Sequence, residues 1–113
     1  MMVFGFGKSV KHHEVDPAAL HAMIQADKAL VVDVREADEF AAGHIPGAIN
    51  LPLSIFSASK VSDPLDRLVV LSCLGGKRSG AALDKCRAAG VAIDTHLAGG
   101  FGAWKSAGLP IER

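Results

Sequence analysis

Three short apolar runs, each flanked by segments with the pattern of a helix, restrict the fold of this chain more than any other feature of its sequence. The runs span residues 29–34 (ALVVDV), 66–73 (DRLVVLSC) and 91–97 (VAIDTHL). The first is apolar almost throughout, as is typical of a strand that is covered on both faces. Strands that alternate with helices form parallel sheets with helices on both faces. The sequence therefore predicts an α/β fold built on a parallel sheet.

The segments around these runs carry signals for helix starts and helix ends. Asp16 is a favourable N-cap, and Pro17 suits the first helical position because an N–H there would be unpaired in any case. The further predicted helices are residues 36–43 closed by Gly43, residues 78–90 closed by Gly90, and a short helix around Trp104. Residues 47–53 predict a short strand that stops near Pro52, and residues 57–63 predict a loop.

Length and charge exclude several classes of protein. The chain has 113 residues and a formal net charge of zero, which predicts a single domain over residues 1–113 and gives no electrostatic basis for binding nucleic acid. No apolar segment approaches the roughly 18 residues that span a membrane. Two cysteines are too few for a disulfide framework, and the first residues lack the pattern of a secretory signal. We therefore expect a cytoplasmic protein with free thiols.

The stretch CLGGKRS, residues 73–79, is the strongest candidate for a functional site. Cys73 stands at the carboxyl end of a predicted strand, which is where ligands bind in open parallel sheets. Gly75 and Gly76 allow backbone angles that other residues avoid, so that successive N–H groups can point inward. Inward N–H groups form an anion-binding nest. The stretch therefore combines a thiol with a site for negative charge.

The residues after the glycines favour a reactive thiol. The next helix is expected to begin near Arg78 or Ser79, so that its positive dipole end faces the thiol of Cys73. A helix N-terminus together with Lys or Arg can lower a cysteine pKa to about 3.5–7.5 and produce the nucleophilic thiolate. Lys77 and Arg78 add such charge if they do not simply point into water. A cysteine after an apolar strand is more often inert and buried, so the interpretation depends on this combination.

Two further segments stand out beside residues 73–79. Residues 31–53 (VVDVREADEFAAGHIPGAINLPL) contain a charged cluster and a GHIPGA stretch, and residues 97–110 (LAGGFGAWKSAGLP) contain paired glycines and a late Gly-Leu-Pro. The three signatures, in order and at ordinary spacing, resemble a single-domain rhodanese of the sulfurtransferase family, whose fold is shared with the Cdc25-type phosphatases. The resemblance covers nearly the whole chain. It implies a three-layer α/β/α fold with a central parallel sheet of about five strands.

The resemblance also implies a transferase that acts through a cysteine persulfide. In the family, the loop cysteine takes sulfur from a sulfane donor and passes it to cyanide or to another thiol. Mapped onto this chain, Cys73 is the catalytic residue, and the N–H groups of the loop hold the outer sulfur as an oxyanion hole would. Lys77 and Arg78 would receive an anionic donor such as thiosulfate, and no cofactor is expected. The substrate-binding loop consists of Leu74, Gly75, Gly76, Lys77, Arg78 and Ser79.

Loop length distinguishes the two branches of the fold. The phosphatases place five residues between Cys and Arg, whereas four separate Cys73 from Arg78. The shorter loop matches sulfur transfer, and a phosphatase or arsenate reductase is the weakest alternative. The main alternative is a sulfur-relay or regulatory binding module that depends on a partner protein, because some members of the fold serve only in binding.

Several other polar residues are interpreted as structural. Cys86 lies thirteen positions after Cys73, far along a helix, and is expected to pack in the core rather than to form a disulfide. Asp33, Arg35 and Glu39 resemble a polar cluster of the family that fastens the loop after a strand. We therefore assign none of these four residues to the chemistry.

The histidines and the GGKRS letters do not indicate metal or nucleotide binding. His44 is expected to be a hydrogen-bonded turn residue, and the adjacent His12 and His13 lack the spacing of a zinc motif, so no metal is predicted. A Walker loop, which binds nucleotide phosphates, would need Gly at the position of Leu71 and Ser or Thr at that of Arg78. The sequence therefore does not predict nucleotide binding.

The aromatic residues near the end of the chain predict packing rather than ligand binding. Phe101 and Trp104 are expected to pack the last helix against the sheet, and a buried Trp104 needs a partner for its N–H.

Overall fold

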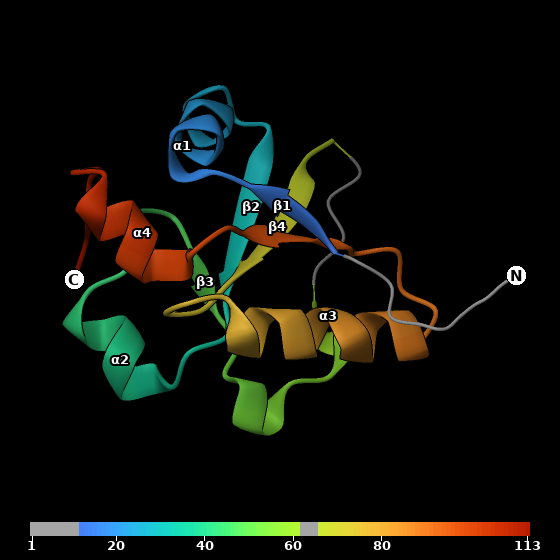
Figure 1. The fold of residues 1–113 in the computed structure, drawn as a ribbon. Coiled ribbons are helices and arrows are strands. Elements are labelled where there is room, and N and C mark those ends of the chain that lie inside the picture. The colour runs from blue at the N-terminus through green and yellow to red at the C-terminus, as the bar shows by residue number, and fades with distance from the viewer. Residues whose placement is uncertain (1–11, 62–65) are drawn as a thin grey trace, which may run out of the picture.

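A parallel sheet lies between helices in the part of the chain that the computed structural model describes, residues 12–61 and 66–113 (Figure 1). Its strands run in the order β1-β5-β4-β2-β3, and each neighbouring pair is parallel. The strands are His13–Val15 (β1), Ala29–Asp33 (β2), Ile49–Asn50 (β3), Leu68–Ser72 (β4) and Thr95–Leu97 (β5). The helices are Pro17–Gln25 (α1), Ala37–Ala42 (α2), Lys77–Ala88 (α3) and Gly100–Ser106 (α4), with 3-10 turns at Leu53–Ile55 (η2) and Ala58–Lys60 (η3). The predicted α/β class is confirmed.

The two faces of the sheet carry separate apolar cores. Along β2, Leu30 and Val32 pack with residues of α3 and η3, whereas Ala29 and Val31 pack with residues of α1 and α4. Figure 1 shows α1 and α3 on opposite sides of the sheet. All five residues of β2 are buried, because side chains that alternate along a strand meet a covered face in either direction.

The predicted helix start at Asp16 is confirmed in detail. Its side-chain Oδ1 accepts a hydrogen bond from the N–H of Ala19 at 2.8 Å, and Pro17 is the first residue of α1. This bond satisfies one of the N–H groups that a helix start leaves without a partner.

The predicted packing of the last helix is also confirmed. Phe101 and Trp104 are buried, and the indole N–H of Trp104 donates to the carbonyl oxygen of Pro110 at 2.7 Å.

Several boundaries differ from the predictions. The strand expected over residues 91–97 is shortened to Thr95–Leu97, and that expected over 47–53 is shortened to Ile49–Asn50. The loop expected over residues 57–63 contains η3, and its last two residues lie outside the described residues. The third helix begins at Lys77, slightly earlier than predicted, because Gly76 takes a left-handed conformation (φ 106°) and serves as its N-cap.

Strand order determines where a functional site can form. Strand β4 lies between β2 and β5 in the middle of the sheet, and Cys73 follows its last residue. The N–H of Val34 donates to the carbonyl oxygen of Ser72 at 2.8 Å, so the chain leaving β2 lies against the end of β4. The carboxyl ends of these strands therefore bring the starts of α2, α3 and α4 toward one place. Among the helices of residues 12–61 and 66–113, none has the length and apolar character that a membrane span requires.

Candidate active site

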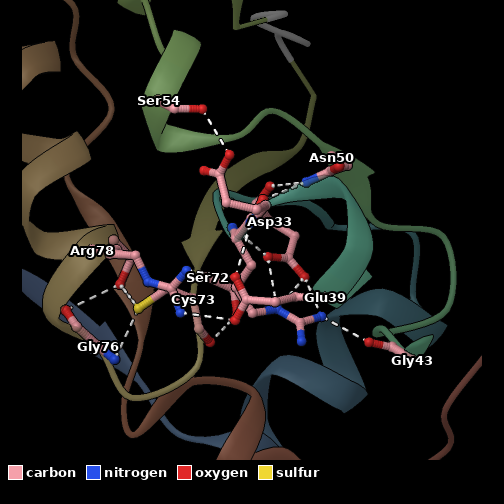
Figure 2. A network of polar contacts seen from close by, with 12 residues as sticks. Asp33, Glu39, Gly43, Asn50, Ser54, Ser72, Cys73, Gly76 and Arg78 are labelled. Carbon is pink, nitrogen blue, oxygen red and sulfur yellow. Dashed lines mark hydrogen bonds and ion pairs between the residues drawn. The ribbon is translucent and has the colours of Figure 1, made fainter. Parts of the chain in front are cut away.

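The thiol of Cys73 lies inside the loop that connects β4 to α3. The residue is 1% exposed, and its Sγ accepts a hydrogen bond from the N–H of Gly76 at 3.0 Å. The hydroxyl oxygen of Ser79 lies 3.5 Å from the same sulfur. Figure 2 shows the sulfur directed toward Gly76, in the concave side of the loop. The sequence prediction of a thiol surrounded by donors thus matches the geometry.

The surroundings of Cys73 favour the ionised sulfur. Burial alone raises the pKa of this thiol, but hydrogen bonds oppose it, first from the Ser79 hydroxyl and then from the N–H groups of Ser79, Gly76 and Gly75. The balance lowers the pKa of Cys73 below its ordinary value. Hydrogen bonds to the charged form are a recognised cause of such a shift. The sulfur is therefore a stronger candidate nucleophile than a free cysteine at neutral pH.

The start of α4 holds the loop from behind. The N–H of Phe101 donates to the carbonyl oxygen of Cys73 at 2.7 Å, and the N–H of Gly102 donates to that of Leu74 at 2.9 Å. Gly100 allows this approach, because a Cβ there would lie 2.4 Å from the carbonyl oxygen of Cys73. The paired glycines near the end of the chain thus position the thiol loop, a role that the sequence pattern alone did not assign.

Arg78 binds a carboxylate rather than projecting into water. Its guanidinium donates to both oxygens of Glu39, at 2.7 and 3.1 Å, and connects α3 to α2 (Figure 2). The Arg78 guanidinium lowers the pKa of Glu39 from 4.5 to about 2. The side chain of Arg78 is 33% exposed, so the pair lies at the surface of the protein. Lys77, by contrast, is exposed at the first position of α3.

The polar cluster after β2 is a buried ion pair. The side chain of Arg35 donates to both oxygens of Asp33, and its Nη2 also donates to the carbonyl oxygen of Gly43 at 2.8 Å. Asn50 donates to the carbonyl oxygens of Asp33 and Arg35. These bonds connect the end of β2 to β3 and to the turn after α2, as Figure 2 shows. The geometry agrees with the interpretation that Asp33 and Arg35 fasten the loop, whereas Glu39 lies outside this pair and binds Arg78.

Comparison with known proteins identifies the family of this chain. A family model described as "Rhodanese-like domain" matches residues 16–107. The chain belongs to the rhodanese-like family. A relative from Allochromatium vinosum named "Sulfurtransferase" is 35% identical over 100 residues, covering 88% of this chain and 94% of the relative. A relative from Actinobacillus succinogenes named "Thiosulfate sulfurtransferase GlpE" is 30% identical over 99 residues, covering 88% and 89%. These names support a transferase of the rhodanese family.

A solved structure gives the same result for the fold. The crystal structure of a rhodanese-related protein from Thermoplasma volcanium matches with a TM-score of 0.76 and 29% identity, covering 89% of this chain and 98% of that one. Two other relatives, from Synechocystis and Bacillus subtilis, are 44% and 43% identical and are named as uncharacterized proteins. This rhodanese-like chain spans only 54% and 61% of their lengths.

The remaining candidates of this rhodanese-like domain lie outside the loop. Cys86 on α3 is fully buried, and burial raises the pKa of its thiol, as expected of a core residue. His44 lies at a turn, where its Nδ1 contacts the carbonyl oxygen of Phe40 at 2.8 Å. His12 binds Asp84 at 2.9 Å, and His13 is exposed beside Asp94. Residues 12–61 and 66–113 contain no cluster of three or more His, Cys, Asp or Glu that could hold a metal ion.

A hollow of about 250 Å³ opens beside the thiol loop. Leu74 of the loop and Phe101 of α4 lie on its wall, together with three basic residues, Arg35, Lys105 and Arg113. Arg35 is neutralised by Asp33. Glu39 also lines the hollow and is paired with Arg78, so Lys105 and Arg113 are the basic side chains that remain for an incoming anion. The sequence prediction did not find these two residues, because neither belongs to the loop and only the fold brings them beside it.

Proposed function

We propose that this rhodanese-like domain is a sulfurtransferase in which Cys73 carries the transferred sulfur as a persulfide. The donor is an anionic sulfane compound of the thiosulfate type, and the acceptor is a thiol or cyanide. The observation that carries the proposal is the position of the Cys73 sulfur, in contact with the Gly76 N–H and the Ser79 hydroxyl at the start of α3. Such donors favour a thiolate before transfer and the developing negative charge during it.

The reaction balances without a cofactor. The thiolate of Cys73 attacks the outer sulfur of thiosulfate, a new S–S bond forms, and the S–S bond of the donor breaks. Sulfite leaves with the electron pair of that bond. Cyanide or a thiolate then attacks the outer sulfur of the persulfide, and the bond to Cys73 breaks to regenerate its thiolate. In both steps, negative charge develops on sulfur beside the N–H groups of the loop.

The charges around the loop suggest separate roles for its basic neighbours. Arg78 is already bound to Glu39 through two hydrogen bonds, so we assign it to holding α3 against α2. Lys105 and Arg113 line the hollow beside Leu74, where they would attract an anionic donor. Lys77, exposed at the start of α3, can add to this attraction. The assignment of Arg78 differs from the sequence prediction, which gave it the donor.

A mass measurement tests the proposal directly. Incubation with thiosulfate is expected to add one sulfur atom to the protein, and cyanide is expected to remove it as thiocyanate. Cys73→Ala should acquire no sulfur, whereas Cys86→Ala should acquire it as the wild type does. A wild type that gains no mass, or a Cys73→Ala variant that gains it equally, would contradict the proposal.

A sulfur-relay module is the second candidate. It is favoured by one observation, that the chain spans only 54% and 61% of the length of two relatives, the proteins from Synechocystis and Bacillus subtilis. In such proteins an acceptor can belong to another domain or to a partner protein. A relay module is expected to form the persulfide readily and to lose it slowly to cyanide. Rapid cyanide turnover would favour the simple sulfurtransferase. Hydrolysis of an aryl phosphate that disappears in Cys73→Ser would instead indicate a phosphatase.

A further inference from the structure

A buried histidine lies behind the thiol loop and has no role in the steps above. His96 of β5 is 7% exposed, and its Nδ1 lies 2.8 Å from the hydroxyl oxygen of Ser79. Ser79 is fully buried on α3, and its hydroxyl oxygen lies 3.5 Å from the Cys73 sulfur. Two hydrogen bonds thus connect Cys73 to His96 through one hydroxyl group, across three elements of the fold.

The single hydroxyl proton of Ser79 couples the two ends of this chain. A neutral Cys73 thiol can donate to the Ser79 oxygen, which then donates its own proton to Nδ1 of His96. A thiolate requires that Ser79 donate to the sulfur, rather than to Nδ1 of His96 or to the carbonyl oxygen of Gly76, which lies 3.2 Å from the same hydroxyl oxygen. In that case Nδ1 must carry a proton, because two lone pairs would otherwise face each other at 2.8 Å. The charge on the sulfur therefore sets the proton on the histidine.

The groups on the far side of His96 favour this arrangement. Its Nε2 lies 3.6 Å from a carboxylate oxygen of Glu14 on the neighbouring strand β1. A carboxylate at that position favours a proton on Nε2, so that Nδ1 of the neutral ring is free to accept one. When Nδ1 also gains a proton, the imidazolium faces Glu14. The carboxylate therefore supports both forms of the ring.

The surroundings of His96 taken together oppose a charge on its ring. Burial lowers the pKa of His96 first, Glu14 raises it, and His12 lowers it. His12 meets the ring of His96 edge to face at 5.9 Å between centroids, and binds Asp84 at 2.9 Å. His96 therefore stays neutral while the Cys73 thiol is neutral, and it gains a second proton only when a negative sulfur forms nearby.

We propose that His96 accepts the proton of Cys73 through the hydroxyl of Ser79, so that the thiolate forms inside the closed loop. The S–H bond of Cys73 breaks as its proton joins the Ser79 oxygen, the original O–H bond of Ser79 breaks, and a new N–H bond forms at Nδ1 of His96. The products are a thiolate and an imidazolium, so the total charge does not change. His96 is a positioning residue, because it acts through Ser79 and does not touch the sulfur. The inference rests on the proposed function only in one respect, that sulfur transfer uses the thiolate as its nucleophile.

Titration of the thiolate tests the relay without any sulfur donor. The ultraviolet absorbance of the Cys73 thiolate, taken as the difference between wild type and Cys73→Ala, reports its pKa and excludes the signal of Cys86. The chain contains no Tyr, so no tyrosinate overlaps this signal. In His96→Asn, the amide keeps a polar group near Ser79 but cannot bind a proton. Below the pKa of Cys73 we expect its thiolate fraction to fall about tenfold.

A matched variant and a reciprocal measurement complete the test. His13→Asn makes the same chemical change at an exposed position on β1 and should leave the titration of Cys73 unchanged. In nitrogen NMR of labelled histidine, His96 should keep its second proton to higher pH in wild type than in Cys73→Ala, by the same factor, because coupling between two sites is reciprocal. Ser79→Ala should abolish that difference while leaving His96 in place.

The outcomes separate the relay from a structural role and from the proposed function. An equal pKa of Cys73 in wild type and folded His96→Asn, or an equal titration of His96 in wild type and Cys73→Ala, overturns the relay. The NMR comparison still decides the question if His96→Asn does not fold. Failure of the wild type to gain sulfur from thiosulfate would overturn the proposed function and would leave these two titrations intact.

Discussion

The two cysteines of this chain are equally inaccessible, yet their surroundings move their acidities in opposite directions. Cys73 is 1% exposed and Cys86 is fully buried. The pKa of Cys86 is raised by burial alone, whereas burial also acts to raise the pKa of Cys73, which is nevertheless lowered. The difference is the set of donors from Gly75, Gly76 and Ser79. Burial therefore does not decide whether a thiol is inert; the hydrogen bonds that reach the sulfur do.

Replacing each cysteine in turn gives the largest expected contrast. Cys73→Ala should abolish sulfur uptake from thiosulfate completely. Cys86→Ala should retain uptake and lose about 1–2 kcal/mol of stability, because it leaves a small cavity under α3. Mass spectrometry after thiosulfate treatment, together with urea unfolding, measures both effects. Sulfur bound at Cys86 in the Cys73→Ala variant would show that the contrast between the two sites is wrong.

Displacing the loop should make Cys73 resemble Cys86. A Cβ at Gly100 (φ +59°) would lie 2.4 Å from the carbonyl oxygen of Cys73 and 2.6 Å from that of Leu74. Both contacts are with backbone, so Gly100→Ala should cost about 3 kcal/mol of stability and raise the pKa of Cys73 as the loop moves. Urea unfolding and titration of the thiolate measure these changes.

Gly108→Ala is the control for Gly100→Ala. Gly108 has a similar φ of +72°, but a Cβ there would have nothing within 4 Å. Its replacement should cost only about 1 kcal/mol through backbone strain and should leave the thiol unchanged. Equal effects of the two substitutions would mean that contact with the loop is not what Gly100 provides.

Stability as a function of pH should show opposite signs for the two thiols. The pKa of Cys73 is lowered by folding, so its contribution is fully present above the unfolded value of about 8.5 and is lost as the pH falls through the folded value. The pKa of Cys86 is raised by folding, so its contribution is fully present below about 8.5 and is lost as the pH rises through the folded value. Each contribution therefore lies in a different pH range.

Urea unfolding under reducing conditions, at pH values both below and above about 8.5, measures these ranges. The destabilisation caused by Cys73→Ala should grow as the pH approaches about 8.5, and that caused by Cys86→Ala should shrink above it. Parallel curves for the two variants would contradict opposite pKa shifts.

The general architecture and the thiol were predictable because they depend on local sequence. The apolar residues of β2 and β4, the cap at Asp16 and the glycines after Cys73 each act within a few residues of their own position. Strand β1 was missed because it is only three residues long and has two exposed side chains, so no apolar run marks it. It forms because β5 offers a parallel partner.

The contacts that complete the site were not predictable, because they join distant parts of the chain. Arg78 and Glu39 are 39 positions apart, and their pairing depends on how α2 and α3 meet. Ser79 and His96 are 17 positions apart and meet only when β5 lies beside β4. The one local hint for His96 is its position in a short strand, three residues before the paired glycines. Side-chain chemistry could be seen in the sequence, but its partners required the register of the sheet.

The smallest expected effect concerns the ion pair that holds the thiol loop against α2. Both side chains are about one-third exposed, at 33% and 32%, so water screens the pair and Arg78→Ala should cost about 1 kcal/mol or less. The folded-state pKa of Glu39 is lowered from 4.5 to about 2, so its contribution is present above 4.5 and is lost as the pH falls toward 2. Urea unfolding of wild type and Arg78→Ala should therefore converge as the pH approaches 2.

A second exposed pair provides the control for Arg78. Arg67 lies 3.8 Å from a carboxylate oxygen of Asp27 that belongs to a largely exposed side chain, so Arg67→Ala should change stability immeasurably. If Arg78 only positions the loop, Glu39→Gln should reproduce the effect of Arg78→Ala on thiosulfate turnover, because either change releases α3 from α2. If Arg78 instead binds the donor, Glu39→Gln should leave the guanidinium free and lower the KM for thiosulfate, while Arg78→Ala raises it. The direction in which Glu39→Gln changes the KM for thiosulfate therefore separates the two roles. It shows whether the Arg78–Glu39 pair holds the Cys73 loop in place or whether Arg78 binds the donor.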